Sequence, residues 1–487
     1  MSTRVAPTSA HLIRLQAVPA ISWAIAVWIA AALFAVLMSI ESIRHHHAFE
    51  TGFDTAIYDQ ALWLLANGHE PFSTITSRPA LADHFTPTLT LLTPLYWLGL
   101  GVTGLLVTQA VGMALTAPAL FALARTSGAS PTVASIPALL WLAPWTAAGN
   151  LFNFRPEGFG PVLLVLTVIA AKQQRHVLLA VTVVLALGLK EDVSLTYVVL
   201  GVLLAFHGLR RIGVVVAVTS GAWFVVASAI MQALAGSYDA FGRRFAGDRG
   251  DSVSDAFAWM ARHPVETAGD VVGQSGITLL LLVLSTGGLA LLAPSWILLS
   301  APTALHNALS AYEPQHGIGS HYHLVPLAGL FIAAAIGAGR LRELGGRGRL
   351  AVTVGVASAA AAAVIGGVMF FDLEKEERVD TAATRRLLER IPPHVPVSAA
   401  PRLLPHLSRR IEIYSLPEPF VPLDWGSPLT RAEMAERAER VRFVAYVEGH
   451  QLKSFFTGDI ADVREMLVRD GFVVVARTGP LQILERR

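Results

Sequence analysis

The sequence contains no cysteine and little charge, and both shortages limit what the protein can be. Without cysteine there is no disulfide framework, no thiol nucleophile, no cysteine-ligated zinc and no iron–sulfur cluster. Charged residues make up 15% of the 487 positions, against roughly 25% in an average soluble chain. The net charge is +2 and no basic block stands apart, so the composition gives no reason to expect a nucleic-acid partner.

The charge is concentrated near the C-terminus. Residues 372–487 hold 36 charged residues in 116 positions, and residues 1–371 hold another 36 in 371 positions. This contrast excludes a single soluble globule and a disordered chain. We therefore predict a transmembrane domain over residues 1–371 and a small extracytoplasmic α/β domain over residues 372–487.

Long apolar segments fill the first part of the chain. A helix needs about 20 mostly apolar residues to cross a bilayer. The candidates are 19–40, 104–125, 130–149, 159–171, 176–189, 193–208, 212–233, 273–292, 294–311, 323–339 and 350–371. The three candidates between 159 and 208 are shorter than a full span. The predicted fold class is thus an α-helical polytopic membrane protein with about 11 transmembrane helices.

The orientation follows from the basic residues, which favour cytoplasmic loops. If the N-terminus is cytoplasmic and the crossings alternate, the inner side receives 11 basic residues and one acidic residue. The outer side of the membrane part receives 8 basic and 16 acidic residues. The apolar stretch 85–99 contains two prolines and is predicted to be interfacial, because a further crossing would break this alternation. The predicted location is a plasma or inner membrane.

The C-terminal part alternates short apolar runs with helix-like segments, which is typical of a small α/β domain. Strands are predicted over 396–399, 411–414, 442–447, 472–477 and 481–484, and helices over 381–391, 429–440 and 459–469.

Five polar clusters of the membrane part fall on the predicted outer face: 41–84, 150–157, 190–192, 237–270 and 312–323. Charged groups at bilayer depth are costly and usually face a cavity or a pathway. We therefore expect these distant segments to form one polar site beneath the C-terminal domain.

The first outer loop carries the candidate catalytic acids Asp54 and Asp59 on a helix that we expect to lie in the membrane interface. Asp54 could act as a general base towards an acceptor hydroxyl, or could simply cap the helix N-terminus. Asp59 is more often a solvated acid on a helix face, and a direct role is the alternative.

The other clusters offer candidate substrate-binding residues. His84 could bind a phosphate or a sugar, or be an interfacial histidine without a role. Arg155 could clamp a phosphate through two donors or pair with Glu157. The consecutive charges Lys190, Glu191 and Asp192 are either part of a site or an ordinary loop.

His321 and His323 complete the candidate set. Imidazoles two positions apart do not share a helix face, so a two-histidine metal site is not expected there. The tract His45–His47 resembles a metal-binding composition, but three consecutive histidines are as plausibly interfacial. We predict no cofactor and no structural metal; a divalent cation would be compatible with the residue types, but nothing in the sequence supports one.

The segments FDTAIYDQALW, DHFTP, RPEGF and LKEDVSL, together with the PLY of TPLYW, resemble an uncharacterised bacterial family of multi-pass membrane proteins related to the GT-C superfamily. The order of a first helix, an outer loop with an acidic motif and a proline-containing apolar segment is similar to the wider superfamily. That superfamily includes the protein O-mannosyltransferases and the aminoarabinose transferases of lipid A.

Such a resemblance implies an enzyme that takes a sugar from a polyprenyl-phosphate donor on the outer leaflet and inverts the anomeric centre. It implies that an acid of the first outer loop is the base, here Asp54 first and Asp59 second. Glu157, Glu191 or Asp192 would then hold a sugar. Two adjacent acids are frequent in that loop in the superfamily, whereas Thr55 follows Asp54 here.

The positive or hydrogen-bonding groups available for the lipid phosphate are Arg155, Lys190, His84, His321, Arg243 and Arg244. The acceptor would be a glycan, lipid or protein of the cell envelope. A transporter or lipid flippase is an alternative, although no inverted repeat is visible. A second alternative is a non-catalytic protein that binds an envelope component.

Overall fold

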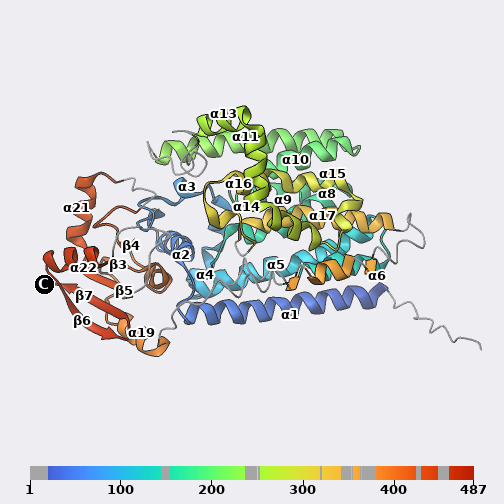
Figure 1. The fold of residues 1–487 in the computed structure, drawn as a ribbon. Coiled ribbons are helices and arrows are strands. Elements are labelled where there is room, and N and C mark those ends of the chain that lie inside the picture. Colours follow the sequence, from blue (N-terminus) through green and yellow to red (C-terminus); the bar gives the residue numbers. More distant parts are fainter. Residues whose placement is uncertain are drawn as a thin grey trace, which may run out of the picture.

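The computed structural model describes residues 20–143, 153–235, 249, 253–318, 321–341, 352–353, 355–361, 363–364, 380–423, 429–447 and 460–487. The described residues form a bundle of helices with a small sheet unit at one end (Figure 1). The long helix α1 runs along one side of the bundle and ends next to the sheet unit.

The bundle is built from helices of very different lengths. The α-helices are α1 (Ala20–His47), α2 (Phe53–Ala66), α3 (Ala80–Asp83), α4 (Pro94–Trp97), α5 (Gly101–Thr126), α6 (Pro131–Leu140), α8 (Gly160–Lys172), α9 (His176–Leu187), α10 (Val193–Phe206), α11 (Arg210–Ala235), α13 (Val253–Arg262), α14 (Pro264–Leu284), α15 (Pro294–Ile297), α16 (Ala301–Leu309) and α17 (Leu324–Arg340). Short 3-10 helices connect them: η1 (Pro87–Leu92), η2 (Pro156–Phe159), η4 (Leu289–Leu292), η5 (Leu298–Ser300), η6 (Glu313–Gln315) and η7 (His321–His323).

Within the described residues, five helices are long and apolar enough to cross a membrane: Ser22–His47, Gly101–Thr126, Arg210–Ala235, Pro264–Leu284 and His321–Arg340. Shorter apolar helices lie at Pro131–Leu140, His176–Leu187 and Val193–Phe206. The predicted number of about 11 crossings stays a prediction, because the segments 130–149 and 350–371 run into residues outside the described ranges.

Two predicted spans are placed differently in the structure. The helix expected over 273–292 is α14, which begins at Pro264 and ends at Leu284. It ends there because Gly287 and Gly288 adopt positive φ angles of 64° and 70°, which a continuing helix does not allow. The span expected over 294–311 is broken into α15, η5 and α16, with Pro294 and Pro302 near the starts of α15 and α16.

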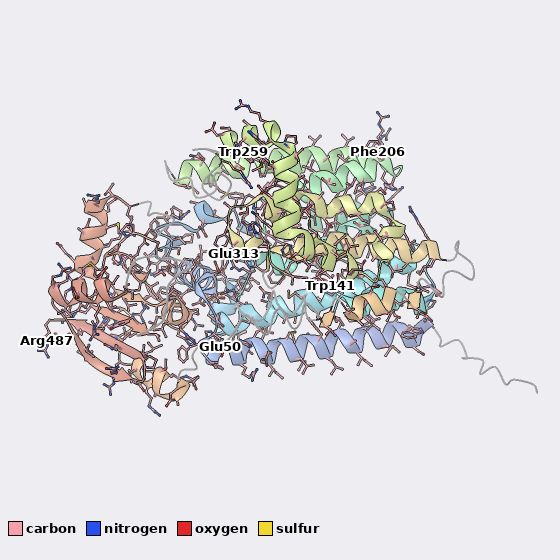
Figure 2. All side chains as sticks on the ribbon, viewed as in Figure 1. Glu50, Trp141, Phe206, Trp259, Glu313 and Arg487 are labelled. Atoms are coloured by element: carbon pink, nitrogen blue, oxygen red, sulfur yellow. The ribbon has the colours of Figure 1, made fainter. Side chains whose placement is uncertain are left out.

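The core of the bundle surrounds α17, which packs against α5, α6 and α8. Trp141 is fully buried there, and its indole N–H donates to the Met113 carbonyl at 2.8 Å; Figure 2 labels it inside the bundle. Helices α10 and α11 approach closely because Gly201 has no side chain: a Cβ there would lie 2.4 Å from the Ala217 nitrogen. By contrast α1 exposes large apolar side chains such as Trp28 and Leu33, as expected for a face towards lipid.

The C-terminal unit has a five-stranded sheet in the order β4-β3-β5-β7-β6. The strands are β3 (Val397–Ala399), β4 (Ile413–Ser415), β5 (Phe443–Val447), β6 (Phe472–Thr478) and β7 (Leu481–Arg486), and the helices are α19 (Thr381–Leu388), η9 (Pro401–Leu403), α20 (Leu404–Leu407), α21 (Arg431–Arg440) and α22 (Ile460–Arg469). β3 is parallel to β4 and β5, and β7 is antiparallel to β5 and β6. The predicted α/β pattern is confirmed, whereas the boundary near residue 371 lies outside the described residues.

Helix α2 lies between the bundle and the sheet unit (Figure 1). The sequence predicted an interfacial helix, but ten of its 14 residues are buried. Phe49, Phe53 and Ile57 share one apolar core with residues of the sheet unit, such as Leu404 and Ile413. The first loop also forms a two-stranded ribbon of β1 (Phe72–Ser73) and β2 (Arg78–Pro79). The other side of α2 is covered by η1 and α5, where Tyr58 and Leu62 pack with Leu89 and Leu105. Helix α2 is therefore enclosed by protein, in part by a segment more than 300 residues away, and its place at the membrane interface stays a prediction.

Candidate functional site

Four of the five polar clusters meet at the end of the bundle that faces the sheet unit. Glu50, which follows α1, lies at this end in Figure 2, and Phe206, which ends α10, lies at the opposite end. Contacts join residues of the first loop to residues near positions 155 and 190, and residues near 321 line one cavity with Glu157 and Lys190. Part of the fifth cluster, including Arg243 and Arg244, lies outside the described residues. Two of its described residues, Arg249 and Asp270, form an ion pair with 2.8 Å between Nη2 and Oδ2.

Asp54 forms an ion pair with Arg155, 101 residues further along the chain. Asp54 lies in the first turn of α2, where a carboxylate is favourable, but the N-cap is Gly52 and not Asp54. Arg155 directly precedes η2, and its backbone N–H donates to the Gln109 side chain of α5. The next residue of α2, Thr55, accepts a hydrogen bond from the Phe154 N–H at 2.7 Å. Helix α2 and the segment before η2 are therefore held together at two adjacent positions.

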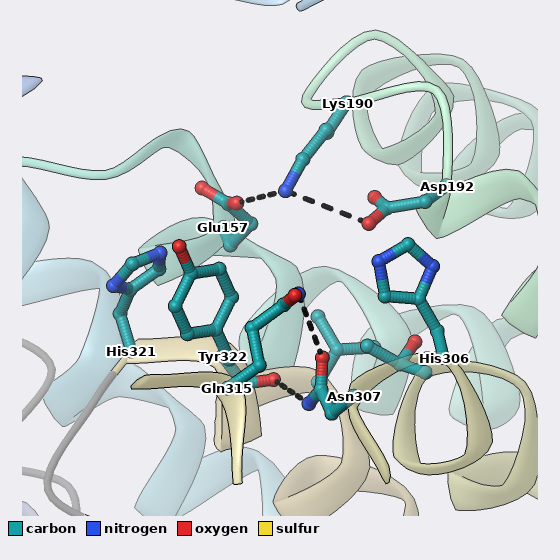
Figure 3. Close-up of a pocket in the computed structure, with 10 residues that line it drawn as sticks. Glu157, Lys190, Asp192, His306, Asn307, Gln315, His321 and Tyr322 are labelled. Carbon is teal, nitrogen blue, oxygen red and sulfur yellow. Dashed lines mark hydrogen bonds and ion pairs between the residues drawn. The ribbon is translucent and has the colours of Figure 1, made fainter. Parts of the chain in front are cut away.

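Lys190 lies between two carboxylates (Figure 3). Its Nζ is 2.8 Å from Glu157 Oε1 and 3.5 Å from Asp192 Oδ2. Burial alone would raise the pKa of Glu157, but the charges of Lys190 and Arg155 lower that pKa to about 2. Burial raises the pKa of Asp192, and the like charge of Glu191 adds to this against the charge of Lys190. Arg155 and Lys190 thus act on the same carboxylate, which makes the two ion pairs parts of one site.

A second pair lies beside Lys190. His84 Nδ1 is 3.0 Å from Glu191 Oε1, and the Phe85 backbone N–H donates to Glu191 Oε2 at 3.0 Å. Burial would lower the pKa of His84, but the charge of Glu191 raises it above its ordinary value of 6.5. Burial would raise the pKa of Glu191, but His84 and Lys190 lower it to about 2.

These shifts predict how stability depends on pH. The pKa of His84 is raised in the folded protein, so its contribution to the free energy of unfolding is complete below pH 6.5 and is lost as pH rises through the folded pKa. The pKa of Glu191 is lowered in the folded protein, so its contribution to the free energy of unfolding is complete above pH 4.5 and is lost as pH falls towards 2. The melting temperature of wild type minus that of His84→Gln should therefore be largest between pH 4.5 and 6.5 and should shrink at higher pH. A difference that grows with pH would contradict this assignment.

The residues around Lys190 line a cavity with a volume of about 20 Å³. This is room for a water molecule and not for a sugar ring, so a larger ligand requires side chains to move. The lining residues are Glu157, Lys190, Asp192, Thr303, His306, Asn307, Gln315, His321, Tyr322 and Val325. Figure 3 shows that they come from two sides, with Lys190 and the two acids opposite residues of α16, η6 and η7.

Several buried polar atoms at this site have no hydrogen-bond partner among the described residues. They are the acceptors Glu157 Oε2 and Gln315 Oε1 and the donor Arg155 Nε. Glu157 and Gln315 are 8% and 1% exposed. Unsatisfied buried polar groups are rare and costly, so these atoms indicate a place for a ligand that both donates and accepts hydrogen bonds.

The structure also has an apolar groove of about 200 Å³. It is lined by Thr88, Leu89, Leu91 and Leu92 of η1, by Phe159, Val162 and Leu163, and by Leu185 and Leu189. Phe159 and Leu189 are within two positions of Glu157 and Lys190 in sequence, so the same two chain segments contribute to the groove and to the cavity. The stretch 85–99 therefore forms one wall of a groove, and Thr88 anchors it by donating to the Leu185 carbonyl at 2.9 Å.

Of the predicted site residues, Glu157, Lys190, Asp192 and His321 line the cavity. Asp54, Arg155, His84 and Glu191 do not line it but belong to the ion pairs beside it, whereas Asp59 and His323 belong to neither group. Asp59 was expected to be solvated more often than not, but it is fully buried and accepts hydrogen bonds from Tyr96 and Ser408. Burial raises the pKa of Asp59 against the influence of Arg409 and of these hydroxyls. His323 is buried at the start of α17 and does not line the cavity, whereas His321 does.

The sequence reasoning missed one wall of the cavity. His306 and Asn307 lie inside a segment that was predicted as a membrane span, and Gln315 and Tyr322 lie in a polar cluster from which only the histidines were singled out. Asn307 donates to the Tyr322 carbonyl at 2.9 Å, and Gln315 donates to Asn307 at 3.5 Å. A signal was present, because a histidine and an asparagine within an apolar span usually face a cavity or a partner.

Comparison with known proteins places this arrangement among membrane proteins. The family model described as "Predicted membrane protein (DUF2079)" matches residues 44–424. No curated protein sequence matches the chain.

Solved structures give a likeness in fold. ArnT from Cupriavidus metallidurans in the apo state is similar with a TM-score of 0.52 at 14% identity, covering 96% of this chain and 98% of that chain. ArnT bound to undecaprenyl phosphate gives a TM-score of 0.47 at 14% identity, covering 96% and 97%. The apo oligosaccharyltransferase of Archaeoglobus fulgidus gives 0.46 at 14% identity, covering 87% and 69%. The predicted fold class, a helical membrane protein with a small C-terminal α/β unit, is confirmed, and the fold is similar to that of ArnT in the apo state.

Proposed function

The chain belongs to the DUF2079 family of predicted membrane proteins, and we propose that it is an inverting membrane glycosyltransferase. It transfers a sugar from a polyprenyl-phosphate donor to a glycan, lipid or protein of the cell envelope. The bundle lies in the plasma or inner membrane with a cytoplasmic N-terminus. The cavity and the sheet unit then lie on the outer side, in keeping with the excess of basic residues on the inner side.

The observation that carries this proposal is a set of buried polar atoms at this site that have no hydrogen-bond partner among the described residues. In the part of the chain that the structure describes, Glu157 Oε2 and Gln315 Oε1 are acceptors without donors, and Arg155 Nε is a donor without an acceptor. The hydroxyl groups of a sugar supply donors, and a phosphate supplies acceptors for a guanidinium. A sugar phosphate therefore satisfies all three atoms, once the cavity has widened to admit it.

The apolar groove accounts for the lipid part of the donor. Its lining side chains are almost all apolar, and Leu189 of the groove directly precedes Lys190 of the cavity in the chain. A polyprenyl chain in the groove therefore places its phosphate between Lys190 and Arg155. These cations stabilise the negative charge that develops on the departing phosphate.

Asp54 is the general base in this proposal. The acceptor hydroxyl attacks the anomeric carbon and forms the new carbon–oxygen bond, while the bond from that carbon to the phosphate oxygen breaks. The hydroxyl proton passes to the Asp54 carboxylate. In the structure Asp54 accepts a hydrogen bond from the Arg155 guanidinium. A donor phosphate that binds this guanidinium takes the place of Asp54 there, and the Asp54 carboxylate can then accept the hydroxyl proton.

The test is transfer by the full chain in liposomes supplied with undecaprenyl-phosphate-linked sugars, with release of undecaprenyl phosphate as the readout. Leu163→Trp, which fills the groove, should raise the KM for the lipid donor about tenfold. Overpacking costs typically about 1–3 kcal/mol, and a loss of about 1.4 kcal/mol in binding free energy weakens binding tenfold. A water-soluble donor with a short prenyl chain should be affected less.

Val184→Trp is the matched control, because Val184 lies on α9 near Leu185 but is 65% exposed. It should leave the KM unchanged. If no donor is turned over, the proposal is wrong. Movement of the intact donor to the opposite leaflet without release of undecaprenyl phosphate would establish the transporter alternative instead.

A further inference from the structure

Helix α2 presents its two acids to different surroundings. Asp59 is five positions after Asp54. A helix turns by about 100° per position, so the two side chains point about 140° apart. Asp54 points towards Arg155 and the bundle. Asp59 points towards Tyr96 and towards Ser408 of the C-terminal unit. Because both acids are on one helix, the contacts that fix Asp59 also fix the direction in which Asp54 points.

Asp59 is held on both oxygens. The Tyr96 hydroxyl donates to Oδ1 at 2.8 Å, the Ser408 hydroxyl donates to Oδ2 at 2.6 Å, and Arg409 Nε is 3.7 Å from Oδ2. Asp59 is fully buried. A buried carboxylate that loses a partner is strongly destabilised, so any rotation of α2 that breaks these contacts is unfavourable.

The neighbouring residue Gln60 makes a second connection to the same unit. Its side chain donates to Thr74 at 2.8 Å and to the carbonyls of Arg410 and Ile411 at 3.3 and 3.2 Å. Thr74 in turn donates to the Ile413 carbonyl at 2.6 Å and accepts from the Ile413 N–H at 2.9 Å. The C-terminal unit thus binds two consecutive positions of α2 through directional bonds.

We propose that Asp59 and Ser408 are positioning residues that fix the rotation of α2, so that the C-terminal unit sets the place of Asp54 in the reaction. This inference rests on the proposed function only in taking Asp54 as the base. It gives the sheet unit a role in turnover itself, beyond any role in binding an envelope component.

The experiment compares Ser408→Ala with Ser408→Thr and with the matched control Ser398→Ala, all in the full chain. Ser398 is also fully buried and donates to the Glu418 carbonyl at 2.6 Å, but it does not touch α2. Ser408→Ala should lower kcat on the order of tenfold, because small misplacement of a reacting group is costly. The KM for the donor should change by less than about twofold, since donor contacts are intact. Ser408→Thr should restore most of the rate.

A second readout is independent of turnover. The chain has no cysteine, so Asp54→Cys supplies a single thiol whose rate of maleimide labelling reports the surroundings of that position. Labelling should become several-fold faster when Ser408→Ala is added and should not change when Ser398→Ala is added. Equal labelling and equal kcat in Ser408→Ala and Ser398→Ala would overturn the inference. If wild type transfers no sugar but the labelling difference is found, the proposed function fails and the positioning of α2 by Ser408 stands.

Discussion

Replacing Lys190 by methionine is expected to destabilise the protein by about 3–5 kcal/mol, because one partner of a buried ion pair is removed. Lys190 is 2.8 Å from Glu157, and both side chains are 10% exposed. Burial alone would lower the pKa of Lys190, but Asp192 and Glu157 raise it, so the lysine is charged and neutralises both acids. Without it two carboxylates remain buried close together. The melting temperature of the purified protein should fall, and sugar transfer should disappear.

The control separates loss of charge balance from loss of a catalytic cation. The triple variant Lys190→Met, Glu157→Gln, Asp192→Asn removes all three charges while nearly conserving side-chain volume. Replacing a buried ionic group by neutral residues of similar volume is often neutral or stabilising. The triple variant should therefore recover most of the melting temperature and none of the transfer. A triple variant that transfers sugar would show that Lys190 serves the fold and not the reaction.

The convergence of these groups was largely predictable from sequence. Charged residues at the ends of apolar segments have few stable places in a membrane protein, and alternation of the crossings put Asp54, Arg155 and Lys190 on one side. The actual pairings were not predictable. Arg155 pairs with Asp54 and not with Glu157, because the choice depends on how α2 and η2 lie against each other, and sequence spacing does not encode that.

Asp59 shows a second limit of sequence reasoning. Its position on α2 suggested a solvated acid, since its near neighbours in sequence offer no reason for burial. Tyr96, which donates to one of its oxygens, is 37 positions away, but Ser408, which donates to the other, is 349 positions away. His306 and Asn307 show the opposite case: their local pattern was informative, but the apolar character of the surrounding segment led to a predicted span. Pro302, inside that segment, was the sequence feature that argued against one continuous helix.

The Asp54–Arg155 pair carries the largest expected effect on the reaction. Asp54→Asn should lower kcat by about 10²–10⁴, the usual contribution of a positioned general base. Arg155→Met should lower kcat by about 10²–10³, because a donor aimed at the departing phosphate is lost.

The decisive measurement is the double variant in the same liposome assay. Residues that act as a unit are strongly non-additive, so Asp54→Asn with Arg155→Met should be little slower than the slower single variant. Asp270→Asn is the matched control, because it removes the charge of one partner of another arginine–aspartate pair, Arg249–Asp270, whose members are 2.8 Å apart. The other hydrogen bond of Arg249 goes to the Leu309 carbonyl and not to Asp54 or Arg155. Asp270→Asn should leave kcat unchanged. Effects of Asp54→Asn and Arg155→Met that multiply in full would mean that the two residues act in separate steps, and a fully active Asp54→Asn would remove Asp54 from the chemistry.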